Sequence, residues 1–108
     1  MSALTTHVLD TARGLPATGV PVRLERRDGT VVGQGRTDED GRVGAFGSDR
    51  LDAGDYRIVF DTGAYFAGLG QAGFYPEVTV TFTLADPGAH YHVPLLLSPY
   101  GYSTYRGS

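Results

Sequence analysis

Histidine is the side chain that most often moves protons near neutral pH, and this chain has three of them. His90 and His92 are two residues apart, so on an extended strand they share one face. A metal ion could use that pair, but zinc usually takes three protein ligands, and only His7 could supply a third nitrogen. A single histidine is also more often a hydrogen-bonded structural residue than a catalyst. The residues around the three histidines must therefore decide between these interpretations.

The segment 90–97 is apolar on both faces of its expected strand. One face carries a tyrosine, a valine and two leucines, and the other carries His92, Pro94 and Leu96. A strand with one side in water normally alternates apolar with polar residues. A chain of this size has no second layer to cover the outer face, so another subunit is expected to cover it. A histidine in such an interface is a better active-site candidate than one in a core.

Alternation of apolar residues with period two runs through most of the sequence and predicts strands. Asp28-Gly29 and Asp40-Gly41 mark tight turns, because glycine tolerates the positive φ angle that such turns need. Residues 13–21 hold glycine and proline turn signals, and 62–70 is where a short helix fits. The pattern predicts an all-β protein, a β-sandwich of about eight strands in two sheets with one short helix. The strands are expected at 4–9, 20–27, 31–37, 42–46, 54–61, 77–84, 90–97 and 100–106.

Two matches to functional motifs fail on their context, and a third motif is absent. Residues 68–73 match the dinucleotide fingerprint G-x-G-x-x-G, but Pro76 prevents the helix that should follow. Aligning 38–41 with a calcium-binding loop puts Arg36 at the first ligand position. No G-x-S-x-G sequence occurs, and Ser103 lies in a strand pattern instead of at a strained turn. No cofactor or metal is expected on this basis.

Composition limits the remaining classes of function. A length of 108 residues suits one domain, 1–108, and 41% hydrophobic with 19% charged residues is typical of soluble globular proteins. A net charge of −3 argues against binding to nucleic acid. Without cysteine, neither a disulfide framework nor a thiolate metal site is possible. No apolar run approaches a membrane span, and MSALTTHVLD lacks the features of a secretory signal, so a cytoplasmic protein is expected.

Four stretches resemble the transthyretin-related 5-hydroxyisourate hydrolases: LTTHVLDTARGLPA, TDEDGR, GDYRIVFDTGAYF and HYHVPLLLSPYGYSTYRGS. The resemblance covers essentially the whole chain, and the terminal Tyr-Arg-Gly-Ser separates the enzymes of this family from the hormone-carrying transthyretins. It implies a transthyretin-like sandwich that assembles into a homotetramer, a dimer of dimers, with sites in the central channel. The implied reaction is hydrolysis of 5-hydroxyisourate, the product of urate oxidation, to 2-oxo-4-hydroxy-4-carboxy-5-ureidoimidazoline, without metal or organic cofactor.

The functional residues of the family correspond one at a time to positions in this chain. The histidine of H-V-L-D matches His7, and the arginine after the D-x-D-G turn matches Arg42. The second histidine of H-Y-H matches His92, and the terminal serine matches Ser108. By the same resemblance, transthyretins carry lysine, glutamate and threonine where this chain has His7, Arg42 and His92, and threonine where it has Tyr105. The resemblance therefore favours an enzyme.

The implied reaction suits these residue types. Attack of water on a ring carbonyl needs a base, and either His7 or His92 could serve while the other orients it or protonates the leaving nitrogen. Arg42 offers a planar set of donors for the carbonyls and the developing oxyanion. Ser108 can offer its hydroxyl and its carboxylate. The residues expected to line the substrate site are Tyr105, Leu96 and Pro94.

The C-terminal tail is expected to be part of the site. Gly107 has no Cβ, so the backbone there can bend and bring Ser108 beside the histidines. A carboxylate held near an imidazole would raise its pKa and fix its orientation. The alternative is an ordinary frayed terminus.

Two other classes of function remain open from the residues. One is a small-molecule carrier that uses the same sandwich without turnover, which predicts an open channel lined by small residues. The other is a structural, adhesion-type β-sandwich, which predicts no cluster of ionisable groups at a buried interface. The bulk of Tyr105 and the set of His7, Arg42 and His92 argue against both.

Overall fold

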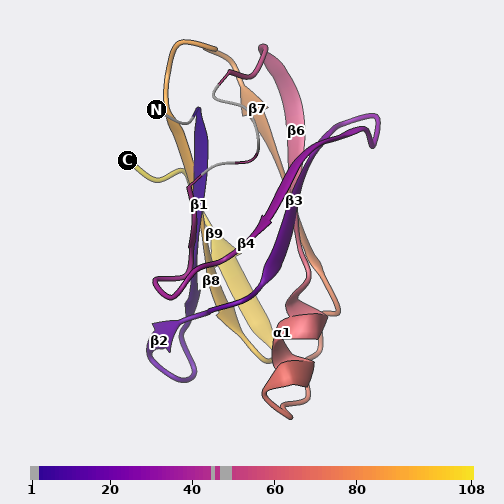
Figure 1. The fold of residues 1–108 in the computed structure, drawn as a ribbon, viewed down its shortest axis with the longest axis vertical. Coiled ribbons are helices and arrows are strands. Elements are labelled where there is room, and N and C mark those ends of the chain that lie inside the picture. The colour runs from indigo at the N-terminus through magenta and orange to yellow at the C-terminus, as the bar shows by residue number, and fades with distance from the viewer. Residues whose placement is uncertain (1–2, 45, 47–49) are drawn as a thin grey trace.

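The structure is a computed structural model, and it describes residues 3–44, 46 and 50–108. Over these residues the chain forms nine strands and one helix (Figure 1). The strands are β1 (Leu4–Asp10), β2 (Leu15–Pro16), β3 (Pro21–Arg26), β4 (Val31–Arg36), β5 (Arg42–Val43), β6 (Gly54–Phe60), β7 (Val78–Leu84), β8 (Tyr91–Ser98) and β9 (Gly101–Thr104), and the helix is α1 (Thr62–Gly68).

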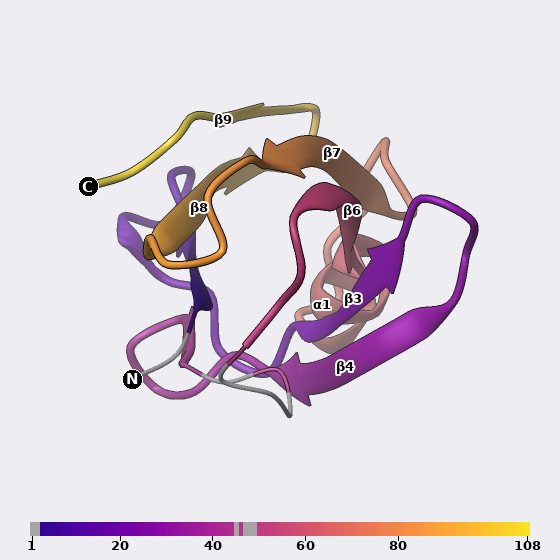
Figure 2. The same ribbon diagram turned by 90° about the horizontal axis from the view of Figure 1, so that it is seen from above.

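The strands form two sheets that pack as a sandwich. The front sheet has the order β2-β1-β8-β9, with β5 pairing alongside β2 on the same edge of β1, and the back sheet has the order β4-β3-β6-β7. Figure 2 shows β8 and β9 in one layer and β3, β4 and β6 in the other. The predicted all-β sandwich of two sheets with a short helix is confirmed.

The core lies between the two sheets and is made by the alternation seen in the sequence. In β1, burial alternates residue by residue, so Leu4, Thr6, Val8 and Asp10 face inward and the residues between them face outward. The same alternation in β6 buries Tyr56, Ile58 and Phe60, and Val59 on the opposite face is also buried. The outward face of β1 and of its neighbours is therefore the surface on which the candidate residues lie.

The pairing of β1 with β8 is parallel, and it joins the two ends of the chain. Leu4 lies opposite Tyr91 and Asp10 opposite Leu97, in register over the full length of β1. All other strand pairs in the described residues are antiparallel. A parallel pair needs a long crossover connection, which here is the whole of the back sheet and α1. The N-terminal and C-terminal segments thus share one sheet.

Helix α1 closes one end of the sandwich. Its N-cap is Asp61, whose side chain accepts a hydrogen bond from the Ala64 backbone N–H at 3.0 Å. Tyr65 is buried and donates its hydroxyl to Asp10 Oδ2 at 2.7 Å, which ties the helix to the end of β1. The chain continues without helix or strand from 69 to 77, so the G-x-G-x-x-G stretch has no helix after it, as predicted.

Three strands differ from the predicted pattern by more than one residue, and the other strands match the predicted ranges to within one residue at each end. Strand β2 lies within the predicted turn region, because a two-residue strand leaves no alternation to detect. Strand β5 covers only two residues of the predicted 42–46, since exposed Gly44 follows and glycine is a weak strand former; Ala45 lies outside the described residues. Strand β9 ends at Thr104 and does not reach Arg106. In the described part of the chain, no helix is long and apolar enough to cross a membrane.

The early end of β9 follows from Pro94. The last β8–β9 pair is Leu95 with Thr104. The residue that would pair next is Pro94, which precedes Leu95 in β8 and has no N–H to donate to the ladder. The Thr104 hydroxyl, not a backbone N–H, donates to the Pro94 carbonyl at 2.7 Å. The chain after Thr104 then runs on beside β8 with different contacts.

Candidate active site

His7 and Arg42 lie side by side on the outward face of the front sheet. They are direct partners in the antiparallel pair of β1 with β5, and His7 is also in register with Pro94 of β8. Residues directly opposite each other have Cβ atoms about 5 Å apart, and their side chains share one face. Three strands thus bring an imidazole, a guanidinium and a proline ring into one row. Arg42 is exposed, Pro94 is buried and His7 is half-buried.

The orientation of His7 is fixed by the turn before Arg42. His7 Nε2 lies 2.7 Å from the carbonyl oxygen of Asp40. A carbonyl oxygen can only accept, so Nε2 carries the proton in this bond. In the neutral imidazole the basic nitrogen of His7 is therefore Nδ1.

The turn itself is held by the carboxylate of Asp38. Asp38 Oδ1 accepts from the backbone N–H groups of Asp40 at 2.9 Å and Arg42 at 3.0 Å. These bonds, that from Arg42 foremost, lower the pKa of the Asp38 carboxyl. Gly41 closes the turn with φ of 77°, and a Cβ there would lie 2.4 Å from the Val8 carbonyl oxygen. The acidic stretch is thus a turn that positions both Arg42 and the partner of His7.

His92 lies two residues before Pro94 in β8, on the same face of the strand, and it pairs with Thr5 of β1. Its Nδ1 lies 2.8 Å from Thr5 Oγ1, and the Nε2 atom of His90 lies 3.2 Å from the same oxygen. His92 is a diagonal neighbour of His7 across the two parallel strands, at a distance on the order of 7 Å. Both histidines of the H-Y-H stretch therefore meet β1 at one residue.

The surroundings of His92 favour its neutral form. Burial lowers its pKa from the usual 6.5, and the positive charges of Arg42, His7 and His90 lower it further. A histidine that is neutral near pH 7 has a nitrogen lone pair available to accept a proton. His92 therefore has the protonation state that a general base needs.

The tail that follows β9 lies against His92. The Gly107 backbone N–H donates to the His92 carbonyl oxygen at 2.7 Å. A Cβ on Gly107 would lie 2.5 Å from Cδ2 of the His92 ring, so only glycine fits without a shift. The φ angle of Gly107 is not in the left-handed region, so the residue is needed for close approach and not for the sharp bend that the sequence suggested.

Arg106 anchors this tail. Its guanidinium lies over the ring of Tyr91, 4.5 Å from the ring centre, in a cation–π contact. Tyr91 is buried at the start of β8 and its hydroxyl accepts from the Asp86 backbone N–H at 2.9 Å. Thr104 at the end of β9, and Arg106 and Gly107 in the tail, thus contact β8 at Pro94, Tyr91 and His92. Ser108 follows directly after Gly107.

The residues expected to line a substrate are more spread out. Leu96 lies opposite Leu9 on the same outward face and borders a hollow of about 400 Å³ beside Ser98 and Ser103. Tyr105 lies beyond the end of β9 and is 58% exposed. The structure therefore gathers His7, Arg42, His92 and Pro94, with Leu96 one step further along β8 and Tyr105 at the sheet edge.

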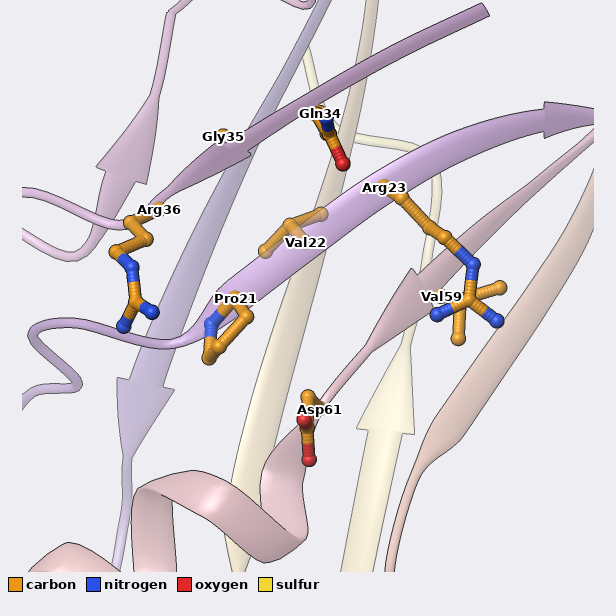
Figure 3. Close-up of a pocket in the computed structure, with 8 residues that line it drawn as sticks. All are labelled: Pro21, Val22, Arg23, Gln34, Gly35, Arg36, Val59 and Asp61. Atoms are coloured by element: carbon orange, nitrogen blue, oxygen red, sulfur yellow. The ribbon is translucent and has the colours of Figure 1, made fainter. Parts of the chain in front are cut away.

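A cavity of about 540 Å³ lies elsewhere, on the outward face of the back sheet (Figure 3). Arg23, Arg36, Gln34 and Asp61 border it. The two arginines already have partners, because Arg23 pairs with Glu25 at 2.5 Å and Arg36 donates to the Gly19 carbonyl at 3.3 Å. The candidate residues lie on the other sheet, so this cavity is separate from the site. Within the described residues, no three histidine or acidic side chains are grouped so that they could hold a metal ion.

Sequence reasoning missed three residues that position the candidates: Thr5, Asp38 and Arg106. The Asp38 turn had a local signal, since an aspartate two residues before Asp-Gly commonly folds its side chain onto the following backbone. The Thr5 and Arg106 contacts had none, because each joins segments that only the strand register brings together.

Comparisons with known proteins match this geometry over nearly the whole chain. The family model described as "HIUase/Transthyretin family" matches residues 4–107. The 5-hydroxyisourate hydrolase of Salmonella dublin is 49% identical over 109 residues, which cover 97% of this chain and 80% of that protein. The solved structure of the Klebsiella pneumoniae 5-hydroxyisourate hydrolase has 40% identity and a TM-score of 0.90, covering 100% of this chain and 94% of that one.

The fold is shared with hormone carriers as well. The crystal structure of transthyretin from Sparus aurata has 33% identity and a TM-score of 0.91, covering 99% of this chain and 97% of that one. The two solved structures are thus equally similar in backbone. The identity of the side chains on the outward face must distinguish the two kinds of protein.

Proposed function

Because the chain belongs to the HIUase/transthyretin family, we propose that it is a 5-hydroxyisourate hydrolase whose site is the face formed by His7, Arg42 and His92. The observation that carries the proposal is the register of three strands, which places His7 between Arg42 and Pro94 and makes His92 its diagonal neighbour. Two imidazoles and a guanidinium on one face suit hydrolysis of a ring carbonyl and give a carrier no evident advantage. Residues 1–108 act as one domain in this proposal.

Each residue has a chemical role that its surroundings support. Water adds to a ring carbonyl of 5-hydroxyisourate, and an imidazole takes its proton. His92 is suited to this role because burial keeps it neutral. Arg42 is exposed on the same face, and its planar donors can bind the developing oxyanion. The C–N bond then breaks, and a proton passes to the leaving nitrogen to give 2-oxo-4-hydroxy-4-carboxy-5-ureidoimidazoline. His7 is placed to orient the substrate, or to pass on that proton after its Nδ1 has accepted it.

The direct test is turnover of the substrate. The protein is mixed with freshly generated 5-hydroxyisourate, and the decay of its ultraviolet absorbance is compared with spontaneous decay. His7→Gln and His92→Gln are each expected to lower kcat by on the order of a hundredfold, with the fold intact by circular dichroism. A wild-type rate no faster than spontaneous decay would contradict the activity, and near-normal turnover in one variant would remove that histidine from the mechanism.

Ser108 is proposed to act at the same site, by its hydroxyl or by its carboxylate. The support is the attachment of Gly107 to His92, because Ser108 is the residue that follows Gly107. An extension added directly after Ser108 is expected to suppress turnover, whereas the same extension before the N-terminus is expected to matter much less. Equal rates for both extended proteins would remove Ser108 from the site. Tyr105, Leu96 and Pro94 are proposed to contact the substrate ring.

A homotetramer, a dimer of dimers, is part of the proposal. The support is the apolar outward face of β1 and β8, where Leu9 and Leu96 lie opposite each other beside the buried Pro94. Two copies that face each other across this surface would enclose the site and exclude water from it. A cytoplasmic location is also part of the proposal and is tested by cell fractionation.

A further inference from the structure

Thr5 contacts both histidines of the H-Y-H stretch and has no role in the chemistry described above. Its Oγ1 atom lies 2.8 Å from His92 Nδ1 and 3.2 Å from His90 Nε2. The contact follows from the parallel register, which pairs Thr5 with His92. Thr5 and His92 are half-buried, while His90 is exposed just before β8 begins. A single oxygen therefore connects a candidate catalytic imidazole to one at the protein surface.

The number of protons in this chain of contacts is limited. A threonine hydroxyl has one proton to donate and two lone pairs that can accept. The hydroxyl can therefore accept an N–H from both imidazoles, or accept from one while donating to the other, but it cannot donate to both. When both bonds form, at least one of His92 Nδ1 and His90 Nε2 therefore carries a proton, so the protonation of the two nitrogens is coupled through Thr5.

We propose that Thr5 is a positioning residue that keeps a proton on Nδ1 of His92 and links that proton to His90, which leaves Nε2 as the basic nitrogen of His92. The ring orientation supports this arrangement. Nδ1 faces Thr5, while Gly107 packs against Cδ2 on the other side of the ring, so Nε2 is the ring nitrogen that Thr5 does not hold. The nitrogen that does not contact Thr5 is the one left to react.

The same three groups form a proton relay. When Nε2 of His92 takes a proton from the attacking water, the ring becomes an imidazolium. Its Nδ1 proton passes to Thr5 Oγ1 while the Thr5 proton passes to His90 Nε2. The positive charge then lies on exposed His90, which can release a proton from Nδ1 to solvent, and reversing the steps returns a proton for the leaving nitrogen. No proton is gained or lost over the cycle.

The relay rests on the proposed function, but the tautomer of His92 can be measured without substrate. Nitrogen NMR of the histidine side chains in the free, full-length protein is expected to show a protonated Nδ1 on His92. Thr5→Val removes the hydroxyl and keeps the shape, and it is expected to move the His92 proton toward Nε2. Thr5→Ser keeps the hydroxyl and is expected to retain the wild-type signals. Unchanged His92 signals in Thr5→Val would overturn the positioning role.

Turnover gives a second, independent reading. Thr5→Val is expected to lower kcat about tenfold with KM little changed. The proton of His92 would then lie on Nε2 in a larger share of molecules, where it blocks the basic nitrogen, while the substrate would still bind. Thr5→Ser is expected to stay near wild type, as is Thr79→Val, the same substitution at an exposed position of β7 in the back sheet. A wild-type kcat in Thr5→Val would overturn the proposal.

His90 is tested by rescue. His90→Gln can still hydrogen-bond but cannot carry a proton, so kcat is expected to fall about tenfold and to recover as imidazole buffer is added at constant pH. Full activity without buffer, or a loss that imidazole does not restore, would overturn the relay. If the wild-type protein does not hydrolyse 5-hydroxyisourate, the proposed function falls, while the NMR signals still decide whether Thr5 fixes His92.

Discussion

His7 and His92 face the same surface with different constraints. The Nε2 proton of His7 is held by the Asp40 carbonyl, whereas His92 is held through Nδ1 by Thr5 and is partly removed from water. Environments that separate two titratable groups in this way commonly assign them different roles as acid and base. In the proposed hydrolysis we therefore expect His92 to be the better base, and His7 the better group to orient the substrate or protonate the leaving nitrogen.

The lowered pKa of His92 makes the stability of the protein depend on pH. Above pH 6.5 the imidazole is neutral in the native and the unfolded chain, so it contributes no pH dependence there. As the pH falls below 6.5, the unfolded chain takes up a proton that the native chain resists, and the free energy of unfolding decreases. We expect His92→Gln to lose less stability than wild type between pH 7 and pH 5 in urea unfolding. Parallel curves for the two proteins would contradict the lowered pKa.

Arg42 is expected to act by the geometry of its side chain and not by its charge alone. Arg42→Lys keeps the positive charge but loses the planar pair of donors, so kcat/KM should fall by on the order of a hundredfold. Arg27→Lys, at the exposed hairpin between β3 and β4, is the matched control and should leave kcat/KM unchanged. Full kcat/KM in Arg42→Lys would show that Arg42 is a turn residue without a role in catalysis.

At the scale of elements, the tail after Thr104 lies against β8 without continuing β9 as a strand. Pro94 stops the β8–β9 ladder, and the chain continues with one contact from a side-chain hydroxyl, one from a guanidinium over a ring and one from a backbone N–H. Each contact comes from a different residue, and together they bring the tail to His92. The proline that ends the strand thus also determines where the tail can go.

This close approach is tested at Gly107. Gly107→Ala would place a Cβ 2.5 Å from His92 Cδ2, so either the tail or the imidazole must move. We expect kcat to fall about tenfold through misplacement of the ring, with the melting temperature nearly unchanged because the tail is exposed. Gly101→Ala is the control, since its Cβ would meet only Ser98 Oγ at an ordinary 3.7 Å. Equal kcat values for the two variants would show that the tail does not constrain His92.

The sequence predicted single elements better than it predicted the contacts between them. Alternation placed His7 on one face of the first strand, and 62–70 was recognised as the stretch where a short helix fits, because those signals are local. The contact of Thr5 with His92 depends on a parallel register between segments 87 residues apart, which no local pattern contains. The stacking of Arg106 on Tyr91 depends in turn on where Pro94 ends β9. Resemblance to a family supplied the candidate residues, but not the residues that hold them.

For the whole molecule, the outward face of the front sheet should be the surface that assembles. Static light scattering near micromolar concentration is expected to give about four times the 11.5 kDa of one chain. Apolar interfaces of this kind resemble the hydrophobic core of a single domain, so the subunits should stay associated at low concentration. Leu96→Glu would place a charge on that face and should reduce the mass, whereas Thr81→Glu on the exposed side of β7 should not. A monomer mass for the wild-type protein would contradict the proposed tetramer.

The parallel pairing of β1 with β8 also has a consequence for the order in which the molecule can form. During synthesis β1 emerges before the other strands of the structure, but β8, which completes its inner edge, emerges only after β2 to β7. The back sheet and α1 can form from local contacts before β8 is made. Until then the apolar face of β1 is not covered and one of its edges is not paired. We therefore expect the face that carries His7 and His92 to be completed late in folding, and a pulse-labelling experiment should find the amides of β6 and β7 protected before those of β1.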